Sequence, residues 1–157
     1  MKNFLTNTIS SISLFCLAAL PGLALAEEGY LYEVLENPQY RKTWDTLIAS
    51  QENVDSWLRD YAKTKNGPTT PSVSVELDDA IYQINFVCKT HDCGSNMFYV
   101  LFSPSAEQAW GLLLNDKDGE VYFGAPNAAQ INALRKEANL LEDNSSKENS
   151  SKDNLSE

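Results

Sequence analysis

The stretch Val73–Cys88, VSVELDDAIYQINFVC, decides the fold class. Its first half alternates apolar residues with serine and glutamate, and its second half alternates large apolar residues with Gln83 and Asn85. A period of two is typical of strands that bury one face. Asp78-Asp79 separates the two halves and predicts a tight turn. The stretch therefore predicts two consecutive antiparallel strands.

Three further strands are predicted downstream, over residues 98–102, 110–114 and 121–123. The segment 116–119, with two aspartates and a terminal glycine, predicts the turn before the last strand. A calcium site in this segment is the less favoured interpretation. The alternating oxygen ligands and distal glutamate of an EF-hand are missing.

The residues before the strands have helical periodicity. Asn37-Pro38 is a typical helix start, with asparagine as the cap and proline at the first helical position. Apolar residues then recur at helical spacing as far as Tyr61. Residues 63–71, which include Asn66-Gly67-Pro68 and the pair Thr69-Thr70, predict a loop between this helical region and the first strand.

A last helix is predicted after the strands. Asn127 is a suitable cap, and Gln130 follows at the spacing of a capping box. The order of helices, strands and helix predicts one α+β domain, with an antiparallel sheet of about five strands and helices on one face.

Both ends of the chain differ from this domain in composition. Residues 1–26 have the features of a secretory signal peptide: a positive charge at Lys2, a short apolar stretch and an A-x-A cleavage site ending at Ala26. A membrane anchor is less favoured because the apolar stretch is short. Residues 143–157 nearly repeat one Asn-Ser-Ser-Lys-acid pattern, which predicts a disordered tail. The domain is therefore expected over 27–142, in the periplasm or secreted.

The charge excludes some classes of partner. The 157 residues include 12 Lys and Arg against 22 Asp and Glu, a net charge of −10, which becomes −11 once Lys2 is removed with the signal peptide. Such a chain is a poor ligand for nucleic acid, and after cleavage no segment predicts membrane association. The chain has only three cysteines and one histidine, which are few ligands from which to build a zinc site. The composition indicates no cofactor.

The composition of the segment 88–94, CKTHDCG, is not explained by packing in a core. It contains the only histidine and both cysteines of the exported chain, and it joins two predicted strands. Export favours a disulfide between Cys88 and Cys93. A ring this small adds only about 2 kcal/mol of stability, so holding a few side chains in one geometry explains it better. Gly94 is expected to leave the ring at positive φ.

Four other interpretations of this segment remain open from the residues alone. A redox pair would favour Cys-x-x-Cys, whereas the spacing here is Cys-x4-Cys. Zinc held by Cys88, His91, Asp92 and Cys93 requires reduced thiols. A hydrolase built on cysteine and histidine requires a free thiolate. The fourth interpretation is a loop with a purely structural role.

The same segment closely resembles the protruding loop, usually written C-K-P-H-D-C, of the Ivy family, bacterial inhibitors of vertebrate (C-type) lysozyme. The resemblance covers about residues 30–138. The similar residues outside the loop are Pro38, Tyr40, Arg41, Trp44, Trp57, Leu58, Thr70, Pro71, Ser72, Val75, Tyr82, Phe123, Gly124, Pro126, Ala128, Ala129 and Gln130. Thr90 stands where the family motif has proline, which leaves φ at this position less restricted.

The resemblance implies a non-enzymatic inhibitor that protects peptidoglycan. Its loop would enter the lysozyme cleft, where His91 would meet the catalytic carboxylates. Asp92 would orient His91 or accept hydrogen bonds from the rim of the cleft. The remaining implied residues are Lys89, Thr90 and Gly94 at the target, and Cys88 and Cys93 as the clamp. A homodimer is also implied, and a binding module for the bacterium's own lytic enzymes is the related alternative.

Overall fold

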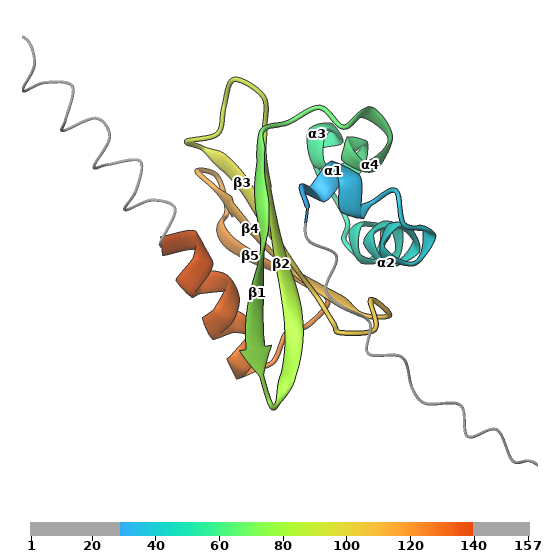
Figure 1. Cartoon of the computed structure of the whole chain (residues 1–157). Helices are drawn as coiled ribbons and strands as arrows, with labels where there is room; N and C mark the ends of the chain where they lie inside the picture. Colours follow the sequence, from blue (N-terminus) through green and yellow to red (C-terminus); the bar gives the residue numbers. More distant parts are fainter. Residues whose placement is uncertain (1–28, 140–157) are drawn as a thin grey trace, which may run out of the picture.

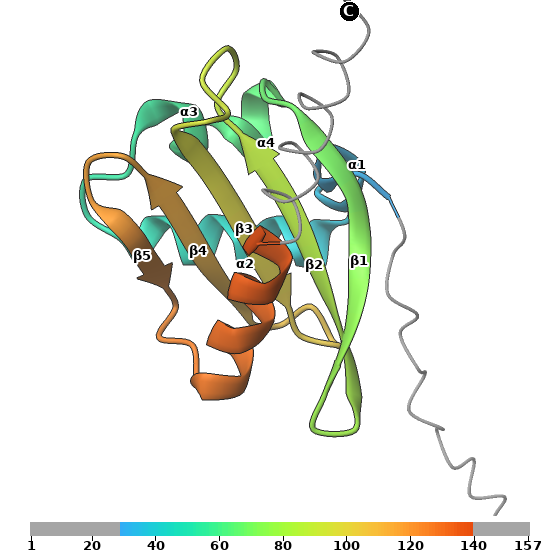
Figure 2. The ribbon, with the colours of Figure 1, turned by 90° about the vertical axis from the view of Figure 1, so that its left-hand side faces the viewer.

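A computed structural model of the chain describes residues 29–139. Its five strands form a single antiparallel sheet in which each strand pairs with the next along the chain (Figure 2). The strands are β1 (Thr69–Leu77), β2 (Ala80–Cys88), β3 (Asn96–Phe102), β4 (Ala109–Asn115) and β5 (Gly119–Phe123). The predicted α+β class and five-stranded antiparallel sheet are confirmed. The predicted signal peptide and tail lie outside the described residues.

Two of the connections between strands are tight turns that depend on short polar side chains. Asp78 and Asp79 turn β1 into β2 with φ of 51° and 61°, the left-handed values that a two-residue type I′ turn requires. Between β4 and β5, the Oδ1 atom of Asn115 accepts hydrogen bonds from the amides of Lys117 and Asp118, at 3.0 and 2.6 Å. Both segments are therefore turns, as the sequence predicts.

Four helices precede the sheet and cover one of its faces (Figure 1). They are α1 (Leu31–Val34), α2 (Pro38–Ala49), α3 (Ser56–Arg59) and α4 (Tyr61–Thr64). The predicted start of α2 is confirmed, because Asn37 Oδ1 accepts a hydrogen bond of 3.0 Å from the amide of Gln39. In the core beneath these helices, the ring of Trp44 packs edge-on against Phe98, with 5.6 Å between the ring centroids.

The other face of the sheet is covered by the C-terminal helix, residues 128–139, as Figure 2 shows. Asn127 and Gln130 form the predicted capping box, with hydrogen bonds of 2.8 and 3.0 Å. Leu134 is fully buried in a second core cluster with β2, β3 and β4. The expectation that helices cover one face is therefore wrong. The central strands carry apolar side chains on both sides, so both faces have to be covered.

Among residues 29–139, no helix has the length and apolar character needed to cross a membrane. One core cluster lies on each face of the sheet, so the sheet is the middle of three layers. The loops lie at the ends of the strands. The β2–β3 loop extends beyond one end of the sheet (Figures 1 and 2).

Candidate functional site: the loop between β2 and β3

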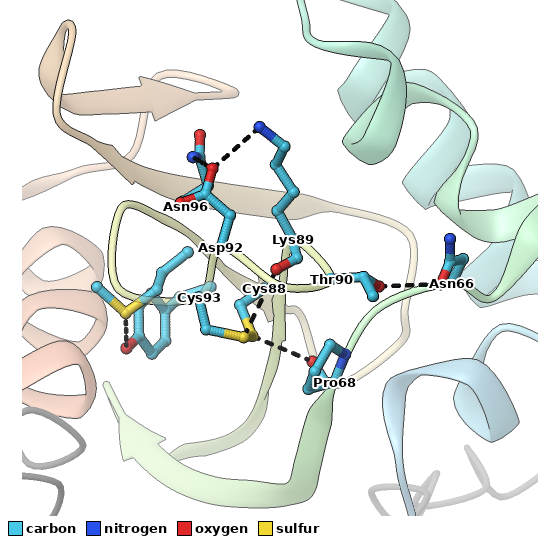
Figure 3. Close-up of a disulfide and its surroundings, with 10 residues drawn as sticks. Asn66, Pro68, Cys88, Lys89, Thr90, Asp92, Cys93 and Asn96 are labelled. Carbon is cyan, nitrogen blue, oxygen red and sulfur yellow. Dashed lines mark hydrogen bonds and ion pairs between the residues drawn. A yellow bond between two sulfur atoms is a disulfide. The ribbon is translucent and has the colours of Figure 1, made fainter.

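The candidate site is the connection from Cys88, the last residue of β2, to Asn96, the first residue of β3. A disulfide joins Cys88 to Cys93 across a sequence separation of five, with 4.9 Å between their Cα atoms (Figure 3). Cys88 is buried at the end of the sheet, whereas Cys93 is half-buried. The predicted disulfide is present, and the ring it closes has one end fixed in the core.

Hydrogen bonds inside the ring form a tight turn. The amide of Asp92 donates to the carbonyl of Lys89 at 2.9 Å, and the amide of Lys89 donates to the carbonyl of Asn96 at 3.0 Å. The Asp92 carboxylate binds two side chains through the same oxygen, Oδ2: the Lys89 ammonium at 3.0 Å and the Asn96 amide at 2.8 Å (Figure 3). Asp92 therefore links the start of the loop at Lys89 to its end at Asn96. Its Oδ2 atom already accepts hydrogen bonds from both residues.

His91 lies at the exposed part of the ring. Its backbone is left-handed, with φ of 64°, a conformation that few non-glycine residues adopt, although histidine adopts it more often than most. No hydrogen bond or ion pair joins its imidazole to another residue of the described chain. The imidazole of His91 is therefore exposed to solvent, and both of its nitrogens are available to a partner.

The expectation that Gly94 leaves the ring at positive φ is wrong. The positive-φ glycines of residues 29–139 are Gly119 and Gly124, whereas Gly94 is exposed and has open space around its Cα. The left-handed residue of the loop is His91, because the turn closed by the Lys89–Asp92 hydrogen bond places its bend there.

Sequence reasoning missed the segment that supports the loop from the side. The Thr90 hydroxyl donates a hydrogen bond of 2.9 Å to Asn66 Oδ1, in the connection between α4 and β1. Gly67 lies so close to the end of β2 that a Cβ atom there would be 2.5 Å from the Cys88 carbonyl oxygen. The Asn-Gly-Pro composition predicted a loop, but no local signal links residues this far apart in the sequence.

Two carboxylates lie beside the loop. A hollow of about 220 Å³ separates the loop from the β4–β5 turn, with Ser95 on one side and Asp116 and Glu120 among the residues on the other. Asp116 and Glu120 are exposed. Lys89 is paired with Asp92 at 3.0 Å and Glu120 with Arg135 at 3.1 Å, so Asp116 is the carboxylate at this hollow that no ion pair with another described residue offsets. The net charge of −10 on the whole chain, to which Asp116 contributes at this hollow, would favour a basic partner.

None of the described residues form a group of three or more histidine, cysteine, aspartate or glutamate side chains suited to holding a metal ion. With both sulfur atoms in the disulfide, neither cysteine is present as the thiolate that zinc binding or nucleophilic catalysis requires. The arrangement is suited to presenting a shaped, rigid tip to another molecule.

Comparison with known proteins identifies the family. A family model described as "Inhibitor of vertebrate lysozyme (Ivy)" matches residues 39–142, which include α2 except its first residue, the whole sheet and the loop. The chain belongs to the Ivy family. The description of this family is that of an inhibitor and not of an enzyme.

Individual relatives of this Ivy-family chain are similar over part of their length. The inhibitor of vertebrate lysozyme of Pseudomonas aeruginosa is 34% identical over 97 residues, which are 60% of this chain and 61% of that protein. The protein of the same name from Escherichia coli K12 is 44% identical over 89 residues, 57% of this chain and 54% of that protein. An uncharacterised protein of Yersinia pestis is 30% identical over 86 residues, 55% and 53% of the two chains. The chain thus spans less than two thirds of each relative.

Proposed function

We propose that this Ivy-family protein inhibits C-type lysozyme by inserting the loop 88–94 into the active-site cleft of the enzyme. One observation carries the proposal: the only histidine of the chain stands exposed on a disulfide-closed ring that extends beyond the sheet. A ring that is shaped before binding loses little conformational entropy when it binds, so more of its contact energy appears as affinity.

The chemistry of the target suits an imidazole. C-type lysozyme works with two carboxyl groups, one kept protonated as the general acid and one ionised. A neutral imidazole has one donor and one acceptor, and a protonated one has two donors. His91 can therefore donate to the ionised carboxylate in either state, and in the neutral state it can also accept from the protonated carboxyl group.

The other predicted contact residues divide into two groups. Thr90 and Gly94 flank the exposed side of the ring, and they would contact the walls of the cleft. Lys89 and Asp92 bind each other, so their part in the complex is to keep the ring in shape while their remaining polar atoms face the rim. Cys88 and Cys93 close the ring.

A cell-wall clearing assay tests the proposal. Purified protein is titrated against hen-type lysozyme, before and after reduction, with the Cys88→Ser/Cys93→Ser variant as a control for effects of the reductant elsewhere. We expect stoichiometric inhibition by the oxidised protein, and weaker inhibition both after reduction and by the double variant. Oxidised protein that leaves lysozyme turnover unchanged at molar excess would overturn the proposal.

Two further arms of this assay separate the alternatives. Lytic enzymes of the bacterium's own envelope replace lysozyme in one arm, and their inhibition in place of lysozyme would favour the binding-module alternative. A dithiol-exchange assay with a model disulfide substrate forms the other arm, and turnover that depends on both cysteines would favour the redox alternative. Under the lysozyme proposal, both arms give no response.

Export and assembly are parts of the same proposal. An inhibitor of lysozyme acts where peptidoglycan is exposed, so we propose a periplasmic or secreted protein whose mature chain begins at Glu27. Mass spectrometry of protein from the periplasmic fraction gives the mature N-terminus. Light scattering distinguishes the implied homodimer from a monomer, and a monomer that still inhibits would remove dimerisation from the mechanism.

A further inference from the structure

The connection between α4 and β1, residues 65–68, lies beside the disulfide ring although 20 or more residues separate the two in sequence (Figure 3). One backbone amide and one side-chain hydroxyl of the ring donate hydrogen bonds to this connection. The amide of Cys88 donates to the carbonyl of Pro68 at 3.0 Å, and the hydroxyl of Thr90 donates to Asn66 Oδ1 at 2.9 Å. The ring is therefore held from the side as well as from the end of β2.

Gly67 makes this close approach feasible. A Cβ atom at this position would lie 2.5 Å from the Cys88 carbonyl oxygen and 2.9 Å from Val87 Cγ2, both well inside normal contact. The same atom would lie 3.6 Å from the ring of Tyr61, whose burial raises the pKa of its hydroxyl. The connection is thus packed against a buried part of the core, which makes it a firm support for Asn66.

His91 lies between two anchored neighbours. On one side, Thr90 is bonded to Asn66, and on the other, Asp92 is bonded to Lys89 and Asn96. A left-handed backbone at a non-glycine residue costs free energy and persists only where its surroundings hold it. These two anchors supply that support at the adjacent positions.

We propose that Asn66 is a positioning residue for His91, acting through the Thr90 hydroxyl from outside the loop. The hydrogen bond between Thr90 and Asn66 restricts the disulfide ring at the position where the family motif has proline. A proline there would restrict the backbone angle φ, whereas in this chain a hydrogen bond between two side chains supplies the restriction. The inference rests on the proposed inhibition of lysozyme for its functional consequence. The tether itself is a property of the free protein and can be measured without lysozyme.

A double-mutant cycle tests the coupling. Thr90→Val removes the hydroxyl and keeps the shape, Asn66→Ala removes the acceptor, and the third variant carries both substitutions. A single exposed hydrogen bond of this kind predicts inhibition about three- to fivefold weaker in each single variant, and no further loss in the double variant. Thr90→Ser keeps the hydroxyl that bonds Asn66, so the loop amides of the free variant are expected to exchange as in the native protein.

Thr46→Val is the matched control. Thr46 is exposed on α2, and its hydroxyl bonds the carbonyl of Lys42 within the same helix. The substitution therefore removes a threonine hydroxyl of the same kind away from the loop. We expect its inhibition constant to equal that of the native protein.

Amide hydrogen exchange in the free protein separates this inference from the proposed function. In Thr90→Val and Asn66→Ala, the loop amides of Asp92 and Ser95 should exchange about three- to fivefold faster, while the amide of Val100 in β3 is unchanged. Unchanged loop exchange, or additive losses of inhibition in the cycle, would overturn the positioning role and leave Thr90 as a direct contact with the target. If the native protein fails to inhibit lysozyme, the proposed function fails, and the exchange rates still decide whether the tether exists.

Discussion

At the scale of single residues, His91 combines two properties that depend on different parts of the side chain. Its imidazole is exposed, and its backbone is left-handed with φ of 64°. Asparagine shares the tolerance for this backbone conformation, whereas alanine does not. Substitutions at this position can therefore separate the chemistry of the imidazole from the shape of the loop.

We predict that His91→Asn and His91→Ala both weaken inhibition by about 30-fold or more, equivalent to about 2 kcal/mol, as expected of a central hot spot. The asparagine variant keeps the backbone preference and loses the imidazole, while the alanine variant loses both. Inhibition constants against lysozyme measure the effect. Full inhibition by His91→Asn with a loss only in His91→Ala would show that loop shape matters and the imidazole does not.

The position of the left-handed residue could not be predicted from the sequence. Glycine is the usual carrier of positive φ, so Gly94 was the natural expectation. The ring has its own geometry, in which the hydrogen bond from Asp92 to Lys89 closes a turn and places the bend at His91. The composition of the loop marked it as the candidate segment, but which residue bends depends on how the ring closes.

At the scale of elements, the local sequence determines the strands and the helix caps, whereas it does not determine how the layers pack. The period of two located the β1–β2 hairpin, and Asn37 and Asn127 marked helix starts that the structure confirms. The same pattern puts Gln83 and Asn85 on the face of β2 opposite Tyr82, Ile84 and Phe86. They are only 2% and 1% exposed, because the helices before the sheet cover that face. Which faces are covered is decided by contacts between distant segments.

The C-terminal helix shows the same limit at Glu137. The residue looks like part of a solvent face in the sequence, yet it lies beside β1, at a hollow that it shares with Val73 and Val75. Burial raises the pKa of the Glu137 carboxyl above its ordinary value of 4.5, and the nearby Lys136 charge opposes this shift. The folded protein therefore binds this proton more tightly than the unfolded chain does.

The sign of the resulting pH dependence follows. A raised pKa in the folded state favours folding at pH values below the unfolded pKa, and this contribution is lost as the pH rises through the folded pKa. We predict that Glu137→Gln is more stable than the native protein at pH 7, by less than about 1 kcal/mol, and equally stable near pH 3, where the native carboxyl is protonated. Urea unfolding at the two pH values measures the difference.

Glu52→Gln is the control for this prediction. Glu52 is exposed outside the helices and strands, so its substitution changes the net charge by the same amount without a change in buried environment. A gain in stability of the same size in both variants would mean that the net charge, and not the burial of Glu137, is responsible.

At the scale of the whole molecule, charge and shape act at different stages of binding. The net charge of −10 is spread over the chain, and exposed carboxylates at Asp116 and Glu120 lie across a hollow from the loop. C-type lysozyme of vertebrates is the basic partner that the resemblance implies. In the proposed complex, long-range attraction between opposite charges would speed the encounter, whereas the fit of the ring in the cleft would determine how long the complex lasts.

This division predicts how salt affects the two rate constants. Raising the ionic strength from about 0.02 M to about 0.5 M shortens the range of electrostatic attraction severalfold, so we expect the association rate constant with lysozyme to fall about tenfold or more. The dissociation rate constant should change by less than about threefold, because the contacts of the ring are short-range. Surface plasmon resonance at several salt concentrations measures both constants. His91→Asn leaves every carboxylate of the chain in place, so it should keep the native salt dependence of association and lose affinity through faster dissociation. An association rate that does not respond to salt would mean that the acidity of the chain plays no part in finding its target.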